Sequence, residues 1–318
     1  MNPDGFLADV LDEPATLARV LEQADVTALA NHIDDARLVV LLGMGSSRFA
    51  ALTAAARLNA RGVPTVVEYA STDLAAAPGR DVLAIGISAS GTSAETVAAL
   101  ARHHGTSRTV ALTNHPDGGE LGAVADLVVG LNAGAEAGGV ACKTFQATLA
   151  TLLLATGIPV EALHPAVAAQ QALLDARHEW LAPLLDLLEG AHSVYALAPA
   201  SRISSSLQSA LMLREGPRIP ADATETGDWS HVDVYLTKYP NYRALMFGGS
   251  PYDAAALDWI AQRGAQIVAV GRPVPGAAQQ IPFPHADDPL VAALVDVTVA
   301  ELAAATWWRR RLDAGQMP

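Results

Sequence analysis

Short runs of apolar, mostly β-branched residues alternate with segments of helical character through the first half of the chain. The segments Arg48 to Asn59 and Ser93 to His104 have the composition of helices. Alternating strands and helices are typical of a parallel sheet covered by helices. The apolar runs predict five strands: Arg37 to Leu42, Pro64 to Tyr69, Val82 to Ile87, Thr109 to Thr113 and Leu127 to Leu131.

A second series of the same kind follows a long helical zone, Thr144 to Leu188, which carries Leu and Ala at helical spacing and no strand signal. We therefore predict an α/β fold of two doubly wound sandwiches with parallel sheets, joined by a helical connector. The predicted strands of the second series are Ser193 to Leu197, Arg243 to Phe247, Gln266 to Val270 and Gln280 to Pro284. Its predicted helices are Ser201 to Arg214, Tyr252 to Arg263 and Pro289 to Arg311.

The expected division of the chain has four parts. Residues 1–30 form an N-terminal helical segment, 31–157 a first domain, 158–190 the connector and 191–318 a second domain. A chain of 318 residues is long enough for two such cores.

The charge balance limits the partners of the protein. The net charge is −13, whereas nucleic acids and anionic membranes attract clustered Lys and Arg, so we expect neither partner. The best uninterrupted apolar stretch, Ala147 to Ile158, is far too short to cross a membrane. Met1 to Asp12 is acidic and lacks the basic start and apolar run of a secretion signal. We expect a cytoplasmic protein.

The single cysteine, Cys142, excludes an internal disulfide and a multi-cysteine metal site. We interpret it as a small buried residue, because no base and orienting group accompany it in the sequence. The histidines show no metal-ligand spacing with a carboxylate. We predict neither a metal nor a cofactor.

The most informative stretch lies where the third predicted strand ends and a helix follows at once. Small hydroxylated residues join the two, with no Lys or Arg among them: Ser88, Ser90, Gly91, Thr92 and Ser93. Such a junction gathers unpaired backbone N–H groups at the positive end of the helix dipole, which favours a phosphate. An ordinary helix N-cap is the alternative interpretation.

A second loop of this type, Gly43 to Ser47, carries Ser46 and Ser47. It lacks the third glycine of a dinucleotide fingerprint, because Arg48 stands there, so we do not expect a nicotinamide cofactor. Strands of one parallel sheet end at the same edge, so both hydroxyl-bearing loops are expected to line one crevice.

Four stretches together resemble the sugar isomerase (SIS) family, and within it the isomerase halves of glutamine–fructose-6-phosphate aminotransferases. They appear in the expected order and span most of the chain. The stretches are Gly43 to Ser47, Ile87 to Thr96, Ala133 to Phe145 and Ala210 to His231.

The resemblance implies two SIS domains and a sugar-phosphate substrate. It implies that Glu215 is the enolising base and that His231 opens the sugar ring. In relatives this histidine reaches the site from the neighbouring subunit, which implies a homodimer with a shared active site. The residues implied to hold the sugar phosphate and nearby hydroxyls are Ser46, Ser47, Ser88, Ser90, Gly91, Thr92 and Ser93.

Several departures from the family argue against glucosamine 6-phosphate synthesis. The sequence holds no counterpart of the family's glutaminase domain, and Lys143 and Lys238 are its only lysines, so none stands near the end where the synthase forms an imine. In addition, Ala89 replaces a glutamine of the phosphate loop, and Asp228 replaces a glutamate near the histidine.

The residues around Glu215 suit a proton-transfer base. Glu215 continues the apolar helix positions Leu207 and Leu211 and precedes Gly216 and Pro217, so it is expected at a helix C-terminus, where the dipole raises a carboxyl pKa. The neighbouring arginines 214 and 218 act in the opposite direction. An exposed glutamate, and for His231 an exposed loop histidine, are the alternatives.

Other charged residues receive structural interpretations. We interpret Asp222 and Glu225 as a solvated acidic loop, the alternative being contact with a substrate amine or with His231. Glu136 and Lys143 are interpreted as a structural ion pair, the alternative being that Lys143 approaches the sugar.

The sequence therefore predicts a phosphosugar aldose–ketose isomerase that works through an enediol on a sugar 6-phosphate. One alternative is an amino-sugar-phosphate deaminase or deglycase with the same site. The second is a regulator that binds a sugar phosphate without turnover.

Overall fold

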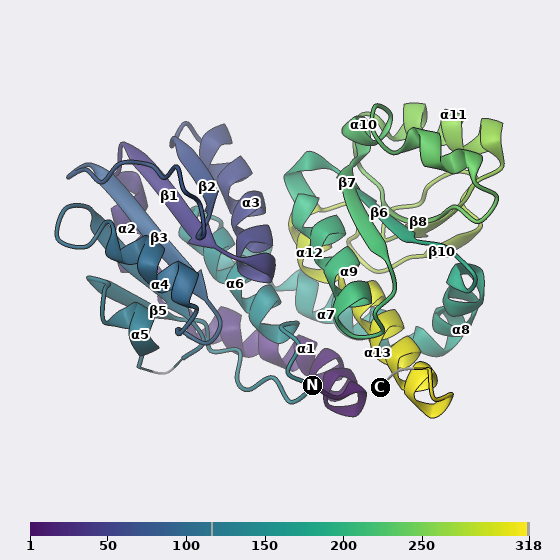
Figure 1. The fold of residues 1–318 in the computed structure, drawn as a ribbon, viewed down its shortest axis with the longest axis horizontal. Helices are drawn as coiled ribbons and strands as arrows, with labels where there is room; N and C mark the ends of the chain where they lie inside the picture. Colours follow the sequence, from purple (N-terminus) through teal and green to yellow (C-terminus); the bar gives the residue numbers. More distant parts are fainter. Residues whose placement is uncertain (116, 317–318) are drawn as a thin grey trace. The chain divides into compact units, whose positions relative to one another are not determined.

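The structure, a computed structural model, describes residues 1–115 and 117–316. They form two compact units (Figure 1). The N-sheet unit comprises Ala15–Ala135 and Ala141–His164, and the C-sheet unit comprises Met1–Pro14, Glu136–Val140 and the chain from Pro165 onward. Residues 317 and 318, the end of the predicted second domain, lie outside the described residues. The predicted domain boundaries stay a prediction.

The N-sheet unit holds a five-stranded parallel sheet in the order β2-β1-β3-β4-β5. The first predicted strand series is confirmed, and each end differs from the prediction by at most one residue. The strands are β1 (Leu38–Gly43), β2 (Thr65–Tyr69), β3 (Val82–Ser88), β4 (Arg108–Thr113) and β5 (Leu127–Gly130).

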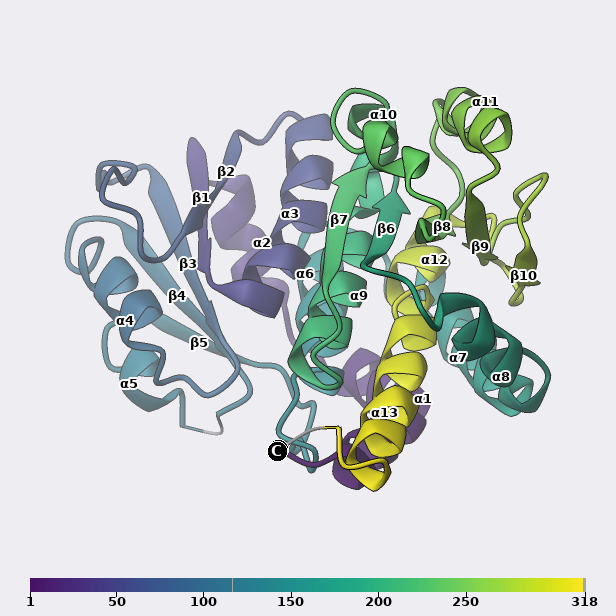
Figure 2. The same cartoon turned by 45° about the vertical axis from the view of Figure 1, so that its right-hand side comes forward.

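Helices cover both faces of this sheet, with α4 and α5 on one side and α3 and α6 on the other (Figure 2). The central strand β3 is buried over its whole length. Gly86 lets the helices approach it, because a Cβ there would lie only 3.0 Å from Leu121 and 3.1 Å from Leu100. The helices of the unit are α2 (Thr27–Asp34), α3 (Gly45–Ala60), α4 (Ala94–Ala101), α5 (Gly119–Gly122), α6 (Lys143–Ala155) and the 3₁₀ turn η1 (Val160–Ala162). Cys142 is fully buried, as predicted.

The C-sheet unit repeats this plan. Its order β10-β9-β8-β6-β7 places the unit's first strand between its second and third, as in the N-sheet unit, which supports a duplication. The two-domain α/β prediction is thus confirmed. The strands are β6 (Val194–Ala198), β7 (Ala221–Glu225), β8 (Arg243–Phe247), β9 (Gln266–Val270) and β10 (Gln279–Ile281).

Strand β7 corrects the interpretation of Asp222 and Glu225 as a solvated loop. Both belong to this edge strand, which pairs in parallel with β6. The strand has no apolar run, because its side chains are partly exposed at the sheet edge; backbone pairing with β6 forms it instead.

The helices of the C-sheet unit lie on both faces of its sheet, with α9 and α13 on one and α10 and α11 on the other (Figure 1). The predicted zone Thr144 to Leu188 is broken into separate helices. The helices are α1 (Pro3–Gln23, which continues into the N-sheet unit), α7 (Pro165–Asp175), α8 (Arg177–Leu188), η2 (Ala200–Arg202), α9 (Ile203–Glu215), α10 (Thr226–Trp229), η3 (Val234–Lys238), α11 (Asp253–Arg263), α12 (Pro289–Val295) and α13 (Thr298–Asp313).

The predicted helix Pro289 to Arg311 is also interrupted, at residues 296 and 297. In the described part of the chain, Pro289–Asp313 is the one segment long and apolar enough to cross a membrane, which the sequence analysis did not anticipate. Its most apolar window is 83% buried inside the protein, as is usual for a core helix.

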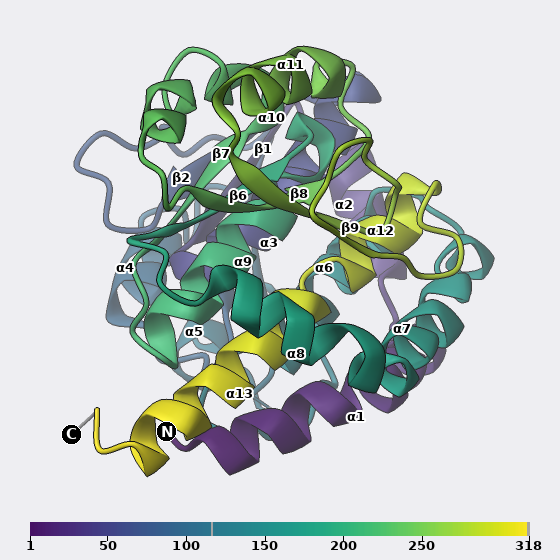
Figure 3. The same ribbon diagram turned by 90° about the vertical axis from the view of Figure 1, so that its right-hand side faces the viewer.

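The first half of α1 lies along α13 (Figure 3). Phe6 packs at 6.5 Å from Trp308, and an ion pair joins Asp4 to Arg309. Deeper in this contact, the buried carboxyls of Glu13 and Glu301 interact with each other.

Two further polar groups hold Glu13: the Gln170 Nε2 donates to its Oε2 at 2.6 Å and the Thr298 hydroxyl donates at 3.2 Å. Burial raises the pKa of Glu13, with Glu301 and Glu136 adding to the effect, and burial raises the pKa of Glu301 to about 7. The pair is therefore most stable while it retains a proton.

We expect the free energy of unfolding to depend on this pair. A folded pKa above the unfolded value of about 4.3 stabilises the fold at low pH, and this stabilisation is lost as the pH rises toward and through 7. Glu301→Gln should therefore reduce the loss between pH 5 and 8 by roughly 1–3 kcal/mol. Urea unfolding at several pH values measures it, with the exposed Glu161→Gln as control. Parallel pH profiles for wild type and Glu301→Gln would contradict the assignment.

Candidate active site

A hollow of about 250 Å³ opens in the N-sheet unit at the carboxyl ends of β1 and β3. The strand order reverses between these two strands, since β2 lies beyond β1 and β4 beyond β3. Ligands of open α/β sheets bind at this switch point. We call the hollow the serine crevice; its lining is Met44, Ser47, Ile87, Ser88, Ala89, Ser90, Ser93 and Thr96.

Four of the seven predicted binding residues line the serine crevice: Ser47, Ser88, Ser90 and Ser93. Ser88 is 5% exposed and ends β3, so the buried strand fixes its position. Ser46 lies beside Ser47 in the first turn of α3, outside the lining.

Gly91 and Thr92 shape the loop rather than line the crevice. Gly91 has a φ of +68°, and a Cβ there would lie 2.6 Å from the Gly118 carbonyl oxygen, so only glycine fits. The Thr92 hydroxyl donates to the Ser90 hydroxyl at 2.9 Å.

Thr96 is a lining residue that the sequence analysis missed. Its hydroxyl donates to the Ser93 Oγ at 3.1 Å, and the residue is 1% exposed. The sequence does carry a signal for Thr96: it follows Ser93 by three positions, which places both on one helix face.

Two helix N-termini meet the serine crevice. Helix α3 begins after Met44 and α4 after Ser93, both of them lining residues. Within the described chain, neither N-terminus has a side-chain cap hydrogen bond, so the first amides of both helices are left for a ligand. Two helix dipoles and several hydroxyls at one point favour a phosphate.

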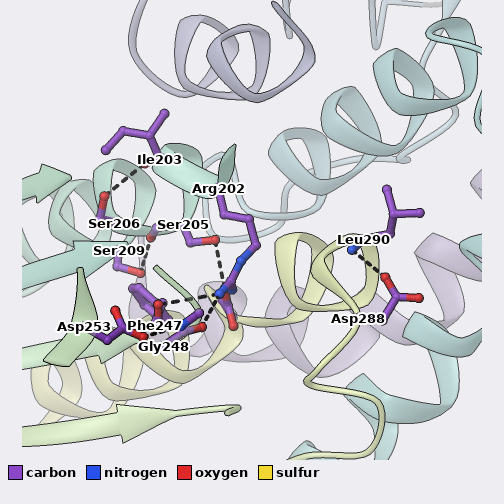
Figure 4. Close-up of polar contacts among 12 residues, drawn as sticks. Arg202, Ile203, Ser205, Ser206, Ser209, Phe247, Gly248, Asp253, Asp288 and Leu290 are labelled. Atoms are coloured by element: carbon purple, nitrogen blue, oxygen red, sulfur yellow. Dashed lines mark hydrogen bonds and ion pairs between the residues drawn. The ribbon is translucent and has the colours of Figure 1, made fainter. Parts of the chain in front are cut away.

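The equivalent switch point of the C-sheet unit lies after β6 and β8, and the chain's own charges fill it (Figure 4). The buried Arg202 forms an ion pair with Asp296 and donates to the Gly248 carbonyl at 2.6 Å. The Ser205 hydroxyl donates to Asp296 at 3.1 Å. Burial raises the pKa of Asp296 to about 6, although Arg202 opposes this.

A carboxylate also occupies the loop after β8. The Asp253 Oδ2 accepts from the Gly249 N–H at 2.6 Å, a donor of the type that a bound anion would use. Among the residues that the structure describes, no charged one lines the serine crevice, although the Ser93 hydroxyl donates to the Glu95 carboxylate at 3.1 Å beside it. The serine crevice is therefore the better anion site of the two.

Glu215 is the last residue of α9 and is partly buried. Burial raises its pKa, whereas the sequence analysis attributed the increase to the helix dipole. The expected apolar face is half-buried: Leu207 and Leu211, which share the face of Glu215, are partly exposed. The helix buries Ala210, Met212 and Leu213 fully, and several polar residues with them. Those buried polar residues are Ser204, Ser205, Ser206, Gln208 and Ser209.

His231 is exposed in the turn after α10, where its backbone N–H donates to the Asp228 carbonyl at 2.8 Å. The Glu225 carboxylate positions this turn, because it caps α10 by accepting from the N–H groups of Gly227 at 2.8 Å and Asp228 at 2.9 Å. The role of Glu225 as a cap is one the sequence analysis did not find.

The structure does not bring Glu215 and His231 together. Helix α9 ends where β7 begins, and the Arg214 guanidinium donates to the Ala221 carbonyl there at 3.3 Å. Helix α10 follows the opposite end of β7 (Figure 2). Five strand residues span about 16 Å, so Glu215 lies at the amino ends of the strands and His231 at their carboxyl ends, on opposite edges of the sheet.

Comparison with known proteins adds to this geometry. The family model of the SIS domain matches residues 32–156, which include the whole serine crevice. The glutamine–fructose-6-phosphate aminotransferase [isomerizing] of Pyrobaculum aerophilum is 31% identical over 257 residues, or 74% of this chain. The chain belongs to the SIS domain family.

This SIS chain spans only 42% of the length of that Pyrobaculum protein. Its fold is shared with solved structures of low sequence identity. The C-terminal domain of glucosamine-fructose-6-phosphate aminotransferase from Francisella tularensis has a TM-score of 0.81 at 16% identity, over 96% of each chain. Glucosamine-6-phosphate deaminase from Thermotoga maritima has a TM-score of 0.75 at 19% identity, over 96% of this chain and 95% of that one.

Removing one serine hydroxyl should weaken phosphate binding. We expect Ser88→Ala to raise the dissociation constant of fructose 6-phosphate roughly ten- to hundredfold, because a hydrogen bond to a charged group is worth about 1.5–3 kcal/mol. Ser250→Ala is the matched control, because Ser250 is buried just after β8, the strand equivalent to β3. Calorimetric titration measures both. Equal weakening by the two substitutions would contradict the serine crevice as the phosphate site.

Proposed function

We propose that this protein is a phosphosugar aldose–ketose isomerase that acts on a sugar 6-phosphate through an enediol. The observation that carries the proposal is the serine crevice, where two uncapped helix N-termini and four serines converge at the switch point of an SIS domain. The crevice suits a phosphate group, which anchors the substrate without taking part in the proton transfer.

In this proposal Glu215 is the base. Its carboxylate removes the proton from the carbon beside the carbonyl of the open-chain sugar, which gives the enediolate. A hydroxyl proton then passes between the two sugar oxygens, and the carboxyl returns its proton to the former carbonyl carbon. A base works best with a pKa close to the operating pH, and the burial that raises the pKa of Glu215 acts in that direction. The proposed role of His231 is to open the ring by moving a proton between the ring oxygen and the anomeric hydroxyl.

The separation of Glu215 and His231 supports a homodimer. Because one C-sheet unit holds them at opposite edges of its sheet, we propose that a second copy of the chain supplies the histidine of each site. The exposure of His231 suits this role. The expectation that the reaction needs no metal or cofactor stays a prediction.

Proton exchange tests the proposed base. Wild-type protein with fructose 6-phosphate in D₂O should exchange the C1 proton, and Glu215→Gln should slow this exchange about 10²–10⁴-fold while binding is retained. Proton NMR measures the exchange, and the exposed Glu179→Gln is the control. No exchange by wild type would contradict the isomerase. Ammonia released from glucosamine 6-phosphate would favour the deaminase instead, and binding without either reaction would favour a regulator.

The pH profile tests the environment of the base. Glu215 must be ionised to act, so its raised pKa places the acid limb of the exchange rate above the usual range of a glutamate. Leu211→Gln, one helical turn away on the same face, should move that limb to lower pH by supplying a polar neighbour. The rate of C1 proton exchange from pH 4 to 8 measures this. An acid limb unchanged by Leu211→Gln would show that this face does not set the pKa.

A further inference from the structure

A larger pocket, of about 610 Å³, lies in the C-sheet unit at the amino ends of β6 and β8. The proposed reaction assigns it no role, because neither Glu215 nor His231 lines it. Its volume is in the range of small-molecule sites. We call it the tyrosine pocket, after Tyr195, Tyr239 and Tyr242 in its lining.

The three tyrosines give the pocket one wall of stacked rings and one exposed wall. Tyr195 and Tyr242 stack with ring centroids 4.7 Å apart and planes 10° from parallel, and Tyr242 is 2% exposed. Tyr239 is 68% exposed, so its ring is available to a ligand. Aromatic faces of this kind contact the apolar C–H face of a ring-shaped ligand.

The polar residues around the pocket favour an uncharged ligand. His192, Ser193 and Asn241 line it. His192 and Asn241 can donate to or accept from hydroxyl groups, whereas the Ser193 Oγ, which donates to the Pro220 carbonyl at 3.0 Å, can accept. No Asp, Glu, Lys or Arg is among the described residues that line the pocket. The carboxylates of Asp222 and Asp233 lie near Tyr195, and the Arg243 guanidinium donates to the Tyr242 carbonyl at 2.9 Å, so charges of both signs surround the pocket.

A hydrogen bond connects the pocket to the segment that carries His231. The Trp229 indole N–H donates to the Tyr242 hydroxyl at 2.9 Å, and both side chains are buried. Trp229 is the last residue of α10, two positions before His231. A ligand that moves the stacked tyrosines therefore acts directly on a side chain of this short helix.

We propose that the tyrosine pocket binds an uncharged sugar that acts as an effector of the protein. A sugar ring fits because it has one apolar face for Tyr239 and hydroxyls at its edge for the uncharged polar residues of the lining. The proposed binding of the sugar rests on the lining and volume of the tyrosine pocket. The effector action rests on the proposed function, because it is exerted through the position of His231.

Saturation-transfer NMR with glucose tests the binding, on the full chain with fructose 6-phosphate present to fill the serine crevice. We expect transfer to the glucose C–H protons, and Tyr239→Ala should weaken glucose binding about tenfold. Tyr235→Ala is the matched control, since Tyr235 is 61% exposed on the adjacent η3 but does not line the pocket. No transfer, or equal loss with both variants, overturns the site. Adenosine binding in place of glucose overturns the ligand class.

Kinetics test the effector action. Glucose should change the rate of C1 proton exchange at least about twofold in wild type, and Tyr242→Phe, which keeps the ring stack but removes the hydroxyl, should bind glucose without this response. A wild-type rate unaffected by bound glucose overturns the effector action. If wild type shows no exchange at all, the proposed isomerase fails and with it the effector action, while the NMR result still decides the binding.

Discussion

The parallel pairing of the strands is the constraint on which the other features depend. In a parallel sheet every strand ends at the same edge, and each following helix begins there. In the N-sheet unit this brings the first turns of α3 and α4 to one point, with their amides uncapped and serines beside them. The proposed anion site thus follows from chain direction and small side chains, without a cationic residue in its lining.

The same constraint explains why two units of one topology do not have the same role. The C-sheet unit also has a switch point, but there Arg202 and Asp296 form an ion pair, and the Asp253 carboxylate accepts a hydrogen bond from the Gly249 N–H. A buried ion pair contributes little net stability against an apolar substitute, so its main effect here is to occupy the space. The two units therefore share a strand order but differ at the switch point, where the N-sheet unit has a hollow and the C-sheet unit a buried ion pair.

Much of the architecture could be predicted from the sequence, because strands buried in a parallel sheet consist of apolar, largely β-branched residues. The serine residues of the crevice were predictable for the same reason, since the end of a strand marks the edge of the sheet. Strand β7 was not, because an edge strand with Asp222 and Glu225 has no apolar run to reveal it. The distinction between the two crevices also escaped prediction, since Arg202 meets a partner 94 positions away.

The tyrosine pocket and the Glu13–Glu301 pair were equally hidden, because each assembles residues from separate segments of the chain. For Glu215 the sequence indicated the helix end correctly, but not the depth of each face: the serines of α9 are fully buried, whereas Leu207 and Leu211 are only half-buried. Periodicity identifies the positions on a helix face, whereas the surrounding fold decides which face is buried.

Parallel topology also places Glu215 and His231 at opposite edges of one sheet, so the proposed reaction requires two copies of the chain. Mixing two inactive variants, Glu215→Gln and His231→Ala, tests this most directly. If the sites are shared, each mixed dimer contains one site with both native residues, and C1 proton exchange returns on mixing after subunit exchange. Continued inactivity of a mixture shown to contain mixed dimers would contradict the account.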